Sequence, residues 1–248
     1  MKIITFNIRC ADDPDGHSID ERAPRLKEIL AKYDPDIVGF QEATPKWLNY
    51  ITEYYGENYE IFNKYRSSAN SESVPIMWKK DKFDCIDKGY FWLTETPWIE
   101  YWGDEKYRYK RICMWVRFVE KATQKEFYYF NTHFGFGDPE QLLSVDLICK
   151  TAKLMNAERF AITGDFNMTP ESKAYTAMTK QFSDVNMITE RDMGTTFHGY
   201  GKEGVNEHID YCFITPETIT ANGSKVIYDM VDGKYPSDHY GILFDLSL

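Results

Sequence analysis

Short apolar segments of strand length alternate along the chain with stretches in which apolar residues recur at helical spacing. Residues 2–8 and 36–42 are two such short apolar segments. Between them, four residues fall at positions i, i+3, i+4 and i+7, on one face of a helix: Leu26, Ile29, Leu30 and Tyr33. This order predicts a strand, a helix and a second strand at the start of the chain.

Three predicted helices have recognisable beginnings. Ser18 and Glu21 have the spacing of a capping box, although Pro24 leaves the start of that helix open. Thr44-Pro45 is a strong N-cap and first-turn pair, and the helix that follows carries its apolar side chains inward: Trp47, Leu48, Ile51 and Tyr55. Asp138-Pro139 opens a third helix, with three leucines along it: Leu143, Leu147 and Leu154.

The remaining apolar segments predict strands. Residues 111–119 alternate cleanly, and residues 126–133 follow after a turn, so this pair predicts a hairpin. Further strands are expected at residues 159–164, 208–215, 224–230 and 240–246. Because helical crossovers are mixed with hairpins, the pattern predicts an α/β fold with mixed strand pairing. No internal repeat or linker divides the sequence, so we expect one domain over residues 1–248.

Composition narrows the classes of partner. The 248 residues carry a net charge of −10, which disfavours binding of a nucleic acid. The charge still permits an enzyme that acts on phosphate esters, because a bound metal ion can supply positive charge. No apolar run approaches the length of a transmembrane helix, so we expect no membrane insertion. Five widely spaced cysteines and the lack of a signal peptide favour a cytoplasmic protein, with export open if a leader was removed.

Polar residues capable of chemistry follow four of the predicted strands directly. They are Asn7, Gln41-Glu42, Asn131-Thr132-His133 and Gly164-Asp165-Phe166-Asn167. Two more polar clusters close the chain: His208-Ile209-Asp210-Tyr211 and Ser237-Asp238-His239. Strand ends of α/β sheets are where ligand sites gather, because rigid strands hold the converging loops.

Each of these clusters also has an ordinary structural interpretation. Gly164-Asp165 is typical of a turn after a strand, and Glu42 of a solvated strand end before a helix cap. Asp238-His239 is compatible with a local hydrogen-bonded pair, and His133 with a structural histidine. The occurrence of all six clusters in this order is harder to explain by separate structural roles.

The whole set of motifs resembles the endonuclease/exonuclease/phosphatase superfamily. The motifs occur in order between residues 3 and 246, and Gly-Asp-Phe-Asn with Ser-Asp-His is specific for the group. Residues 194–199 and 233–239 resemble a bacterial branch. The resemblance implies a four-layer αββα sandwich, in which two face-to-face mixed β-sheets are flanked by helices. It also implies hydrolysis of phosphoester bonds assisted by a divalent metal.

The expected metal ligands are Asn7, Glu42 and Asp238. Mg²⁺ prefers hard oxygen ligands, few of them carboxylates, with room left for water and a substrate phosphate. Two carboxylates and one amide oxygen suit Mg²⁺, or Mn²⁺ in its place.

The expected catalytic residues are His133, Asp165, Asn167, Asp210 and His239. Asp165 would orient or deprotonate the attacking water, and Asn167 would position that water or the phosphate. His239 would contact the phosphate or move a proton, while Asp210 holds its other ring nitrogen. His133 would stabilise the charged transition state or assist the leaving group.

The candidates for substrate binding are Arg111, Asn167 and His133. Arg111 precedes a strand and could reach a phosphate, although an exposed arginine at a strand end is the alternative, and Arg9 and Arg22 share this ambiguity. Residues 92–109 are rich in aromatic side chains, which can stack on a sugar or base, lie at a membrane interface, or pack a long loop.

Departures from the family pattern bear on the substrate. Gly135-Phe136, Gln141 and His208 stand where related bacterial sequences carry other residues, including arginines. Fewer basic residues favour a small phosphomonoester or phosphodiester, such as a sugar phosphate. The alternatives are a nuclease acting on DNA or RNA, a sphingomyelinase-like phospholipid phosphodiesterase, and a non-catalytic binding module on the same fold.

Overall fold

The computed structural model describes residues 1–68, 72–100, 109–189 and 194–248. Its strands are β1 (Lys2–Asn7), β2 (Ile37–Gln41), β3 (Tyr59–Phe62), β4 (Ile76–Lys79), β5 (Phe83–Trp92), β6 (Ile112–Glu120), β7 (Lys125–His133), β8 (Phe160–Asp165), β9 (Ser183–Asp184), β10 (Asp210–Ile214), β11 (Thr220–Ile227) and β12 (Gly241–Ser247). Its helices are α1 (Ile19–Tyr33), α2 (Pro45–Tyr55), α3 (Asp138–Leu154), α4 (Lys173–Thr179) and α5 (Val185–Ile188), with a 3₁₀ turn at Gly199–Gly201.

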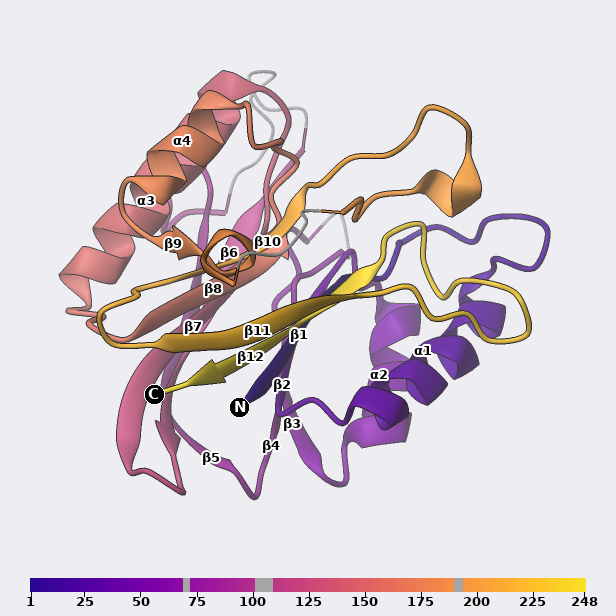
Figure 1. Cartoon of the computed structure of the whole chain (residues 1–248), viewed down its shortest axis with the longest axis horizontal. Coiled ribbons are helices and arrows are strands. Elements are labelled where there is room, and N and C mark those ends of the chain that lie inside the picture. Colours follow the sequence, from indigo (N-terminus) through magenta and orange to yellow (C-terminus); the bar gives the residue numbers. More distant parts are fainter. Residues whose placement is uncertain (69–71, 101–108, 190–193) are drawn as a thin grey trace.

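These strands form two six-stranded sheets that pack face to face (Figure 1). The first sheet has the order β11-β12-β1-β2-β4-β3, and the second has the order β5-β6-β7-β8-β10-β9. Helices α1 and α2 lie on the outer face of the first sheet, while α3 and α4 lie on that of the second (Figure 1). The expected four-layer αββα sandwich is therefore confirmed.

Apolar side chains fill the spaces between the layers. The space between the sheets is packed by side chains from both, among them Ile3, Trp78, Met114, Phe118 and Phe244. The contact of α1 and α2 with the first sheet includes Leu26, Trp47 and Phe40, and that of α3 and α4 with the second includes Ile148, Met178 and Phe160. This close packing holds the strand ends rigidly in place.

The expected helix starts are confirmed. Ser18 and Glu21 form a complete capping box at the start of α1, and Pro24 lies inside that helix. The hydroxyl of Thr44 accepts a hydrogen bond from the backbone N–H of Trp47, which caps α2. Such caps satisfy backbone groups that the first turn of a helix leaves unpaired.

Two features differ from the sequence-based expectations. Strands β3, β4 and β5 were not anticipated, because two of them span only four residues and β5 is an edge strand with several exposed positions. In α3, the buried face includes Ser144, Val145 and Ile148, whereas Leu154 is 79% exposed. Leu147 is partly buried against the same core, so the leucines mark the contact face only in part.

No helix within the described ranges is long and apolar enough to cross a membrane. The five cysteines, all of which lie in described segments, are free thiols. Two of them, Cys113 and Cys212, are fully buried in the second sheet and act there as small apolar side chains.

Strand direction brings the polar strand ends to one edge. In the first sheet, β1 and β2 are parallel, so Asn7 pairs with Gln41. In the second, β7 and β8 are parallel and pair His133 with Asp165, while antiparallel β10 begins beside them with Asp210. Both sheets therefore present their chemistry-bearing residues at the same end of the sandwich.

A buried polar network joins the sheets just below this edge. The side-chain amide of Asn131 on β7 donates hydrogen bonds to three carbonyl groups of the first sheet and its flank, the shortest to Phe40 at 2.7 Å. Its oxygen accepts a hydrogen bond from Gln41 at 2.8 Å. A Cβ on Gly39 would lie 2.5 Å from the Asn131 oxygen, so this close approach needs a glycine.

Replacing Asn131 with alanine should lower the free energy of unfolding by about 2–3 kcal/mol, because buried carbonyl and amide groups would lose their partners. Chemical denaturation measures this difference. Asn49, exposed on α2, is the matched control, and Asn49→Ala should change stability by less than about 0.5 kcal/mol. Equal stabilities for the two variants would contradict a structural role for the Asn131 network.

Candidate active site

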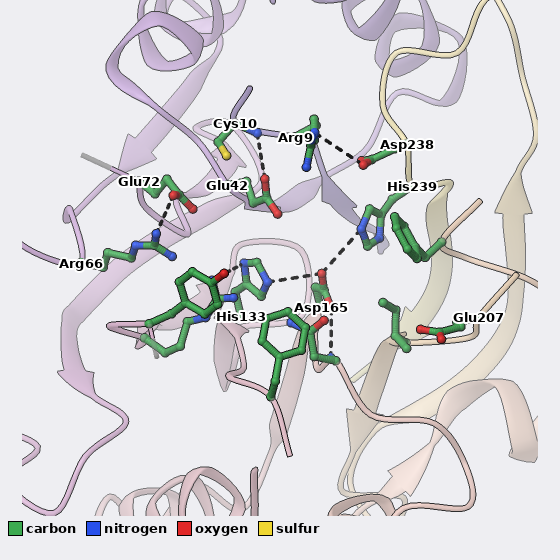
Figure 2. Close-up of a pocket in the computed structure, with 16 residues that line it drawn as sticks. Arg9, Cys10, Glu42, Arg66, Glu72, His133, Asp165, Glu207, Asp238 and His239 are labelled. Atoms are coloured by element: carbon green, nitrogen blue, oxygen red, sulfur yellow. Dashed lines mark hydrogen bonds and ion pairs between the residues drawn. The ribbon is translucent and has the colours of Figure 1, made fainter. Parts of the chain in front are cut away.

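A cavity of about 330 Å³ opens at the edge where the strand ends of both sheets meet (Figure 2). Its walls are Arg9, Cys10, Glu42, Arg66, Glu72, Tyr109, Arg111, His133, Phe136, Asp165, Asn167, Phe197, Glu207, Ile209, Asp238 and His239. Asn7 and Asp210 lie directly behind this wall and are at most 1% exposed. All residues that the sequence singled out for metal binding, catalysis or substrate binding therefore gather in or against one cavity.

Asn7 joins the two sheets at the floor of the cavity. Its side-chain amide donates hydrogen bonds to Glu42 at 3.2 Å and to Asp165 at 2.9 Å. Its side-chain oxygen Oδ1 accepts one from the backbone N–H of Arg9 at 3.0 Å. Asn7 therefore holds two carboxylates in place, that of Glu42 and that of Asp165, and orients both toward the cavity.

Asp165 and His239 form a buried charged pair that Asp210 completes. The His239 Nδ1 atom lies 2.9 Å from the Asp210 carboxylate, and its Nε2 lies 3.7 Å from Asp165. Burial alone would lower the pKa of His239, but the charge and hydrogen bond of Asp210 raise it to about 10. Burial, together with the charge of Asp210, raises the pKa of Asp165 to about 7.

His133 lies on the other side of Asp165, and Arg111 determines its tautomer. The Arg111 Nη1 atom is 3.0 Å from the Nδ1 of His133. Since a guanidinium only donates, Nδ1 must accept, and the ring hydrogen of a neutral His133 is therefore on Nε2. Nε2 faces Asp165 at 3.4 Å. Burial and the charge of Arg111 lower the pKa of His133 well below its ordinary value, so it is a neutral hydrogen-bond donor.

Asn167 is held by backbone contacts on the cavity rim. Its side-chain amide donates to the carbonyl of Phe134 at 3.0 Å, which leaves its side-chain oxygen available as an acceptor. Its backbone N–H donates to Asp165 at 3.0 Å. Gln141, which stands near a position where an arginine was expected, donates to the backbone carbonyl of Asn167 and supports this turn.

Three cavity residues have left-handed backbone conformations: Arg9 (φ 59°), Glu42 (φ 61°) and Asn167 (φ 48°). Each comes directly or shortly after a strand, where the chain turns to direct a side chain into the cavity. Non-glycine residues rarely adopt this conformation, and such strain concentrates at functional sites. The surrounding packing must therefore maintain these three turns.

The donor set around Glu42 fits a hard divalent cation. Burial would raise the pKa of Glu42, but hydrogen bonds from Cys10 and Asn7 keep it below its ordinary value, so the group is ionised. Asp238 faces the same cavity, 3.6 Å from the Arg9 guanidinium. Carboxylate oxygens are ligands that Mg²⁺ and Mn²⁺ accept, and a carboxylate oxygen of Glu72 lies within 4.8 Å of one of Glu42. Asn7 turns its NH₂ group toward Glu42 and its oxygen toward the backbone of Arg9.

Four further residues of the wall were not anticipated from the sequence: Cys10, Arg66, Glu72 and Glu207. The backbone N–H of Cys10 donates to Glu42 at 2.8 Å, and burial raises the pKa of its thiol. Arg66 and Glu72 form an ion pair on the loop between β3 and β4, and Glu72 lies beside Glu42 (Figure 2). Because neither strand was anticipated, no sequence signal placed this loop at the site.

The structure distinguishes the three arginines whose position the sequence left open. Arg111 is only 7% exposed and lines the cavity, so the alternative of an exposed strand-end arginine is wrong. Arg9 also lines it and makes two hydrogen bonds to Asp13. Arg22 is fully buried and donates to backbone carbonyls of neighbouring loops, among them that of His17 at 2.8 Å, which is a structural role.

Other expected features have mixed outcomes. His208 is buried against the carbonyl of Gly194 and does not line the cavity. Of the aromatic stretch 92–109, Trp92 is packed in the core, Trp98 is 64% exposed and Tyr109 lines the cavity. Its residues 101–108, with Tyr101, Trp102 and Tyr107, lie outside the described part of the chain.

The comparisons with known proteins agree with this geometry. A family model described as "Endonuclease/Exonuclease/phosphatase family" matches residues 4–239, and the chain belongs to this family. Members of the family are hydrolases that act on phosphoester bonds, and so is this protein. Divalent metal dependence is typical of the family.

Solved structures extend the similarity over the whole chain. An endonuclease/exonuclease/phosphatase from Bacteroides vulgatus is 30% identical, with a TM-score of 0.91 over 100% of this chain and 98% of its own. A mannosyl-6-phosphatase of Bacteroides thetaiotaomicron is 26% identical, with a TM-score of 0.90 over 100% of both chains. TDP2 of D. rerio, complexed with single strand DNA product, is 17% identical (TM-score 0.81, 100% and 99% covered) and shares the fold.

Replacing Arg111 with methionine should free the Nδ1 atom of His133 and remove the positive charge beside it. The pKa of His133 should therefore rise toward its ordinary value, and the Nε2–H tautomer should lose its preference. ¹⁵N NMR of the imidazole ring measures both quantities. Arg111→Lys keeps a charged donor and is the control. The same titration and tautomer in Arg111→Met as in the wild type would overturn the assignment.

Proposed function

We propose that this protein is a divalent-metal-dependent phosphatase of a small phosphate ester, such as a sugar phosphate. The observation that carries this proposal is the composition of the cavity wall, which combines five carboxylates with three arginines. The carboxylates are Glu42, Glu72, Asp165, Glu207 and Asp238, and the arginines are Arg9, Arg66 and Arg111. Such a wall suits one phosphate carried with a metal ion and offers no excess positive charge to a polyanion.

The arginines support this interpretation individually. Arg9 is paired with Asp13, and Arg66 with Glu72, so the charge of each is largely compensated. Arg111 faces the cavity beside His133 and is the arginine best placed to contact a phosphate oxygen. One such contact is sufficient for a phosphomonoester, whereas a nucleic acid is held through many phosphates.

Glu42 and Asp238 would hold Mg²⁺ or Mn²⁺, with Asn7 beside them as the third expected ligand. When bound there, the ion would neutralise phosphate charge and stabilise the transition state. Asn7 also fixes the direction of Glu42 through its hydrogen bond. The roles of these residues follow from their chemistry and their common position at the cavity.

Asp165 is the residue that we assign to the attacking water. Its pKa of about 7 allows it to accept a proton near neutral pH, and the proton it gains would come from that water. Asn167, on the adjacent turn, has a free side-chain oxygen that would accept the second hydrogen of the same water. Together they would orient the water for attack on phosphorus.

The two histidines would act on the phosphate itself. His239 is held charged by Asp210 and would neutralise a phosphoryl oxygen or donate a proton through Nε2. Neutral His133 would donate the hydrogen on its Nε2 to a second phosphoryl oxygen. Arg111, next to His133, would contribute positive charge to the same side of the phosphate. Preorganised donors of this kind stabilise the charge that develops in the transition state.

The name of one relative supports a sugar phosphate. The B. thetaiotaomicron protein, a mannosyl-6-phosphatase, matches this chain over its full length. The net charge of −10 also disfavours long nucleic acids. We therefore place a hexose phosphate ahead of DNA, RNA and phospholipid as the substrate, and we take residues 1–248 as one catalytic domain.

Replacing Asp165 with asparagine should lower kcat on the hydrolysed ester by about 10³-fold, because the water loses its proton acceptor. Steady-state kinetics with Mg²⁺ measures this loss, and chelation by EDTA should abolish wild-type activity until Mg²⁺ is restored. Asp146, exposed on α3, provides the control, since Asp146→Asn should keep full activity. Full Mg²⁺-dependent activity in Asp165→Asn would remove Asp165 from the proposed mechanism.

A panel of hexose phosphates, bis(p-nitrophenyl) phosphate, plasmid DNA and sphingomyelin vesicles should show turnover of the small esters alone. Raising NaCl from 50 to 200 mM should change that rate by less than about threefold, whereas polyanion binding weakens by orders of magnitude. Nicking of the plasmid at a comparable rate would instead identify a nuclease. Metal binding with no turnover on any substrate would identify a binding module.

A further inference from the structure

A second cavity continues the active site along one side. It has a volume of about 470 Å³ and lies between the loop that follows β1 and the loop that precedes β10. Arg9, Phe197 and Asp238 line both cavities. The two cavities therefore adjoin along these three residues, and the second cavity is here called the side groove, lined by Asp13, His17, Tyr200, Lys202 and Val205.

An aromatic pair connects the two loops of the side groove. The rings of His17 and Tyr200 lie 4.0 Å apart and are tilted by 36°. Tyr200 has a left-handed backbone (φ 58°) and stands between two glycines that also have positive φ values, Gly199 and Gly201. This left-handed turn places a large aromatic ring in the wall of the side groove.

Carboxylates outnumber cations in the side groove, with Asp13, Asp15 and Asp238 against Arg9 and Lys202. Arg9 binds Asp13 through two hydrogen bonds of 3.0 and 3.1 Å, and Lys202 stands on the same wall as an exposed cation. Asp15 adds a further carboxylate. A wall of aromatic faces and carboxylates, without an excess of positive charge, suits an uncharged group with many hydroxyls, because the hydroxyls bond to the charged atoms and the C–H face packs on a ring.

The geometry of phosphoryl transfer decides which part of the substrate would enter the side groove. Attack on phosphorus is in line, so the alcohol leaves on the side opposite the attacking water. Asp165 and Asn167 hold that water in our proposal, and neither lines the side groove. Arg9 and Asp238, which lead into it, lie across the cavity from Asp165 (Figure 2). The leaving alcohol therefore points toward the side groove.

We propose that the side groove binds a second sugar unit. The substrate would then be a phosphorylated disaccharide or longer glycan, whose phosphate-bearing unit occupies the main cavity. This inference rests on the proposed phosphatase function, and it specifies the class of the leaving alcohol. Tyr200 is the specificity-determining residue, because its ring would pack against the second sugar.

The test compares a hexose 6-phosphate with a disaccharide that carries the same 6-phosphate. The wild type should hydrolyse the disaccharide with a kcat/KM at least about tenfold higher, in the range expected for one added packing contact. Tyr200→Ala should bring that ratio close to one, while Tyr200→Phe keeps the ring and should keep the ratio. Phe136→Ala, which alters an aromatic side chain of the main cavity only, should change both substrates alike.

Equal kcat/KM values for the two substrates in the wild type would overturn the inference, as would a ratio that Tyr200→Ala leaves unchanged. If neither sugar phosphate is hydrolysed, the proposed function has failed, and the side groove is then tested separately. The unphosphorylated disaccharide should compete with bis(p-nitrophenyl) phosphate hydrolysis in the wild type and not in Tyr200→Ala. If that ester is not turned over, calorimetric titration with the same disaccharide replaces the inhibition assay. Absence of competition or binding in the wild type would refute the second sugar site itself.

Discussion

The hydrogen bonds of one buried amide, that of Asn7, hold the two halves of the site together. Asn7 ends β1 in the first sheet and donates to Glu42 on its own sheet and to Asp165 on the other. The side chains of a strand alternate between faces, so a slip of one residue in β1 would turn this amide away from both carboxylates. The inter-sheet network around Asn131 and Gln41 prevents such a slip.

The electrostatics of the cavity follow from that contact. Packing the sheets together buries Asp165 and Asp210 beside each other, and burial with like charge raises the pKa of Asp165 to about 7. His239 compensates this charge and is itself held protonated by Asp210. On the other flank, Arg111 keeps His133 neutral. Of the two histidines beside Asp165, His239 is thus protonated and His133 is neutral, because burial acts on both rings and only His239 has a carboxylate on its other nitrogen.

Loops, rather than strands, decide what the cavity can accept. The loop after β1 supplies Arg9 and Cys10, and the loop between β3 and β4 supplies Arg66 and Glu72. The loop before β10 supplies Phe197 and Glu207 and continues into the side groove. A rigid strand framework with variable loops is how one fold acts on different phosphate esters, so the substrate must be inferred from these loops.

The sequence by itself determined the class of fold, the family and a set of polar residues that gather at one cavity, because apolar periodicity and strand-end motifs are local signals. Asn7, Glu42, Asp165 and His239 each follow or precede a strand that the pattern predicts. Only the tertiary structure showed that Arg111 is buried against His133. It also brought Arg66 and Glu72 to the cavity, which the sequence did not indicate because strands β3 and β4 are too short to leave a periodic signal. It also decided the charge states, since these depend on contacts between residues of different strands and loops, such as Arg111 with His133 and Asp210 with His239. Local sequence specifies which groups are present, and burial and distance specify what each of them can do.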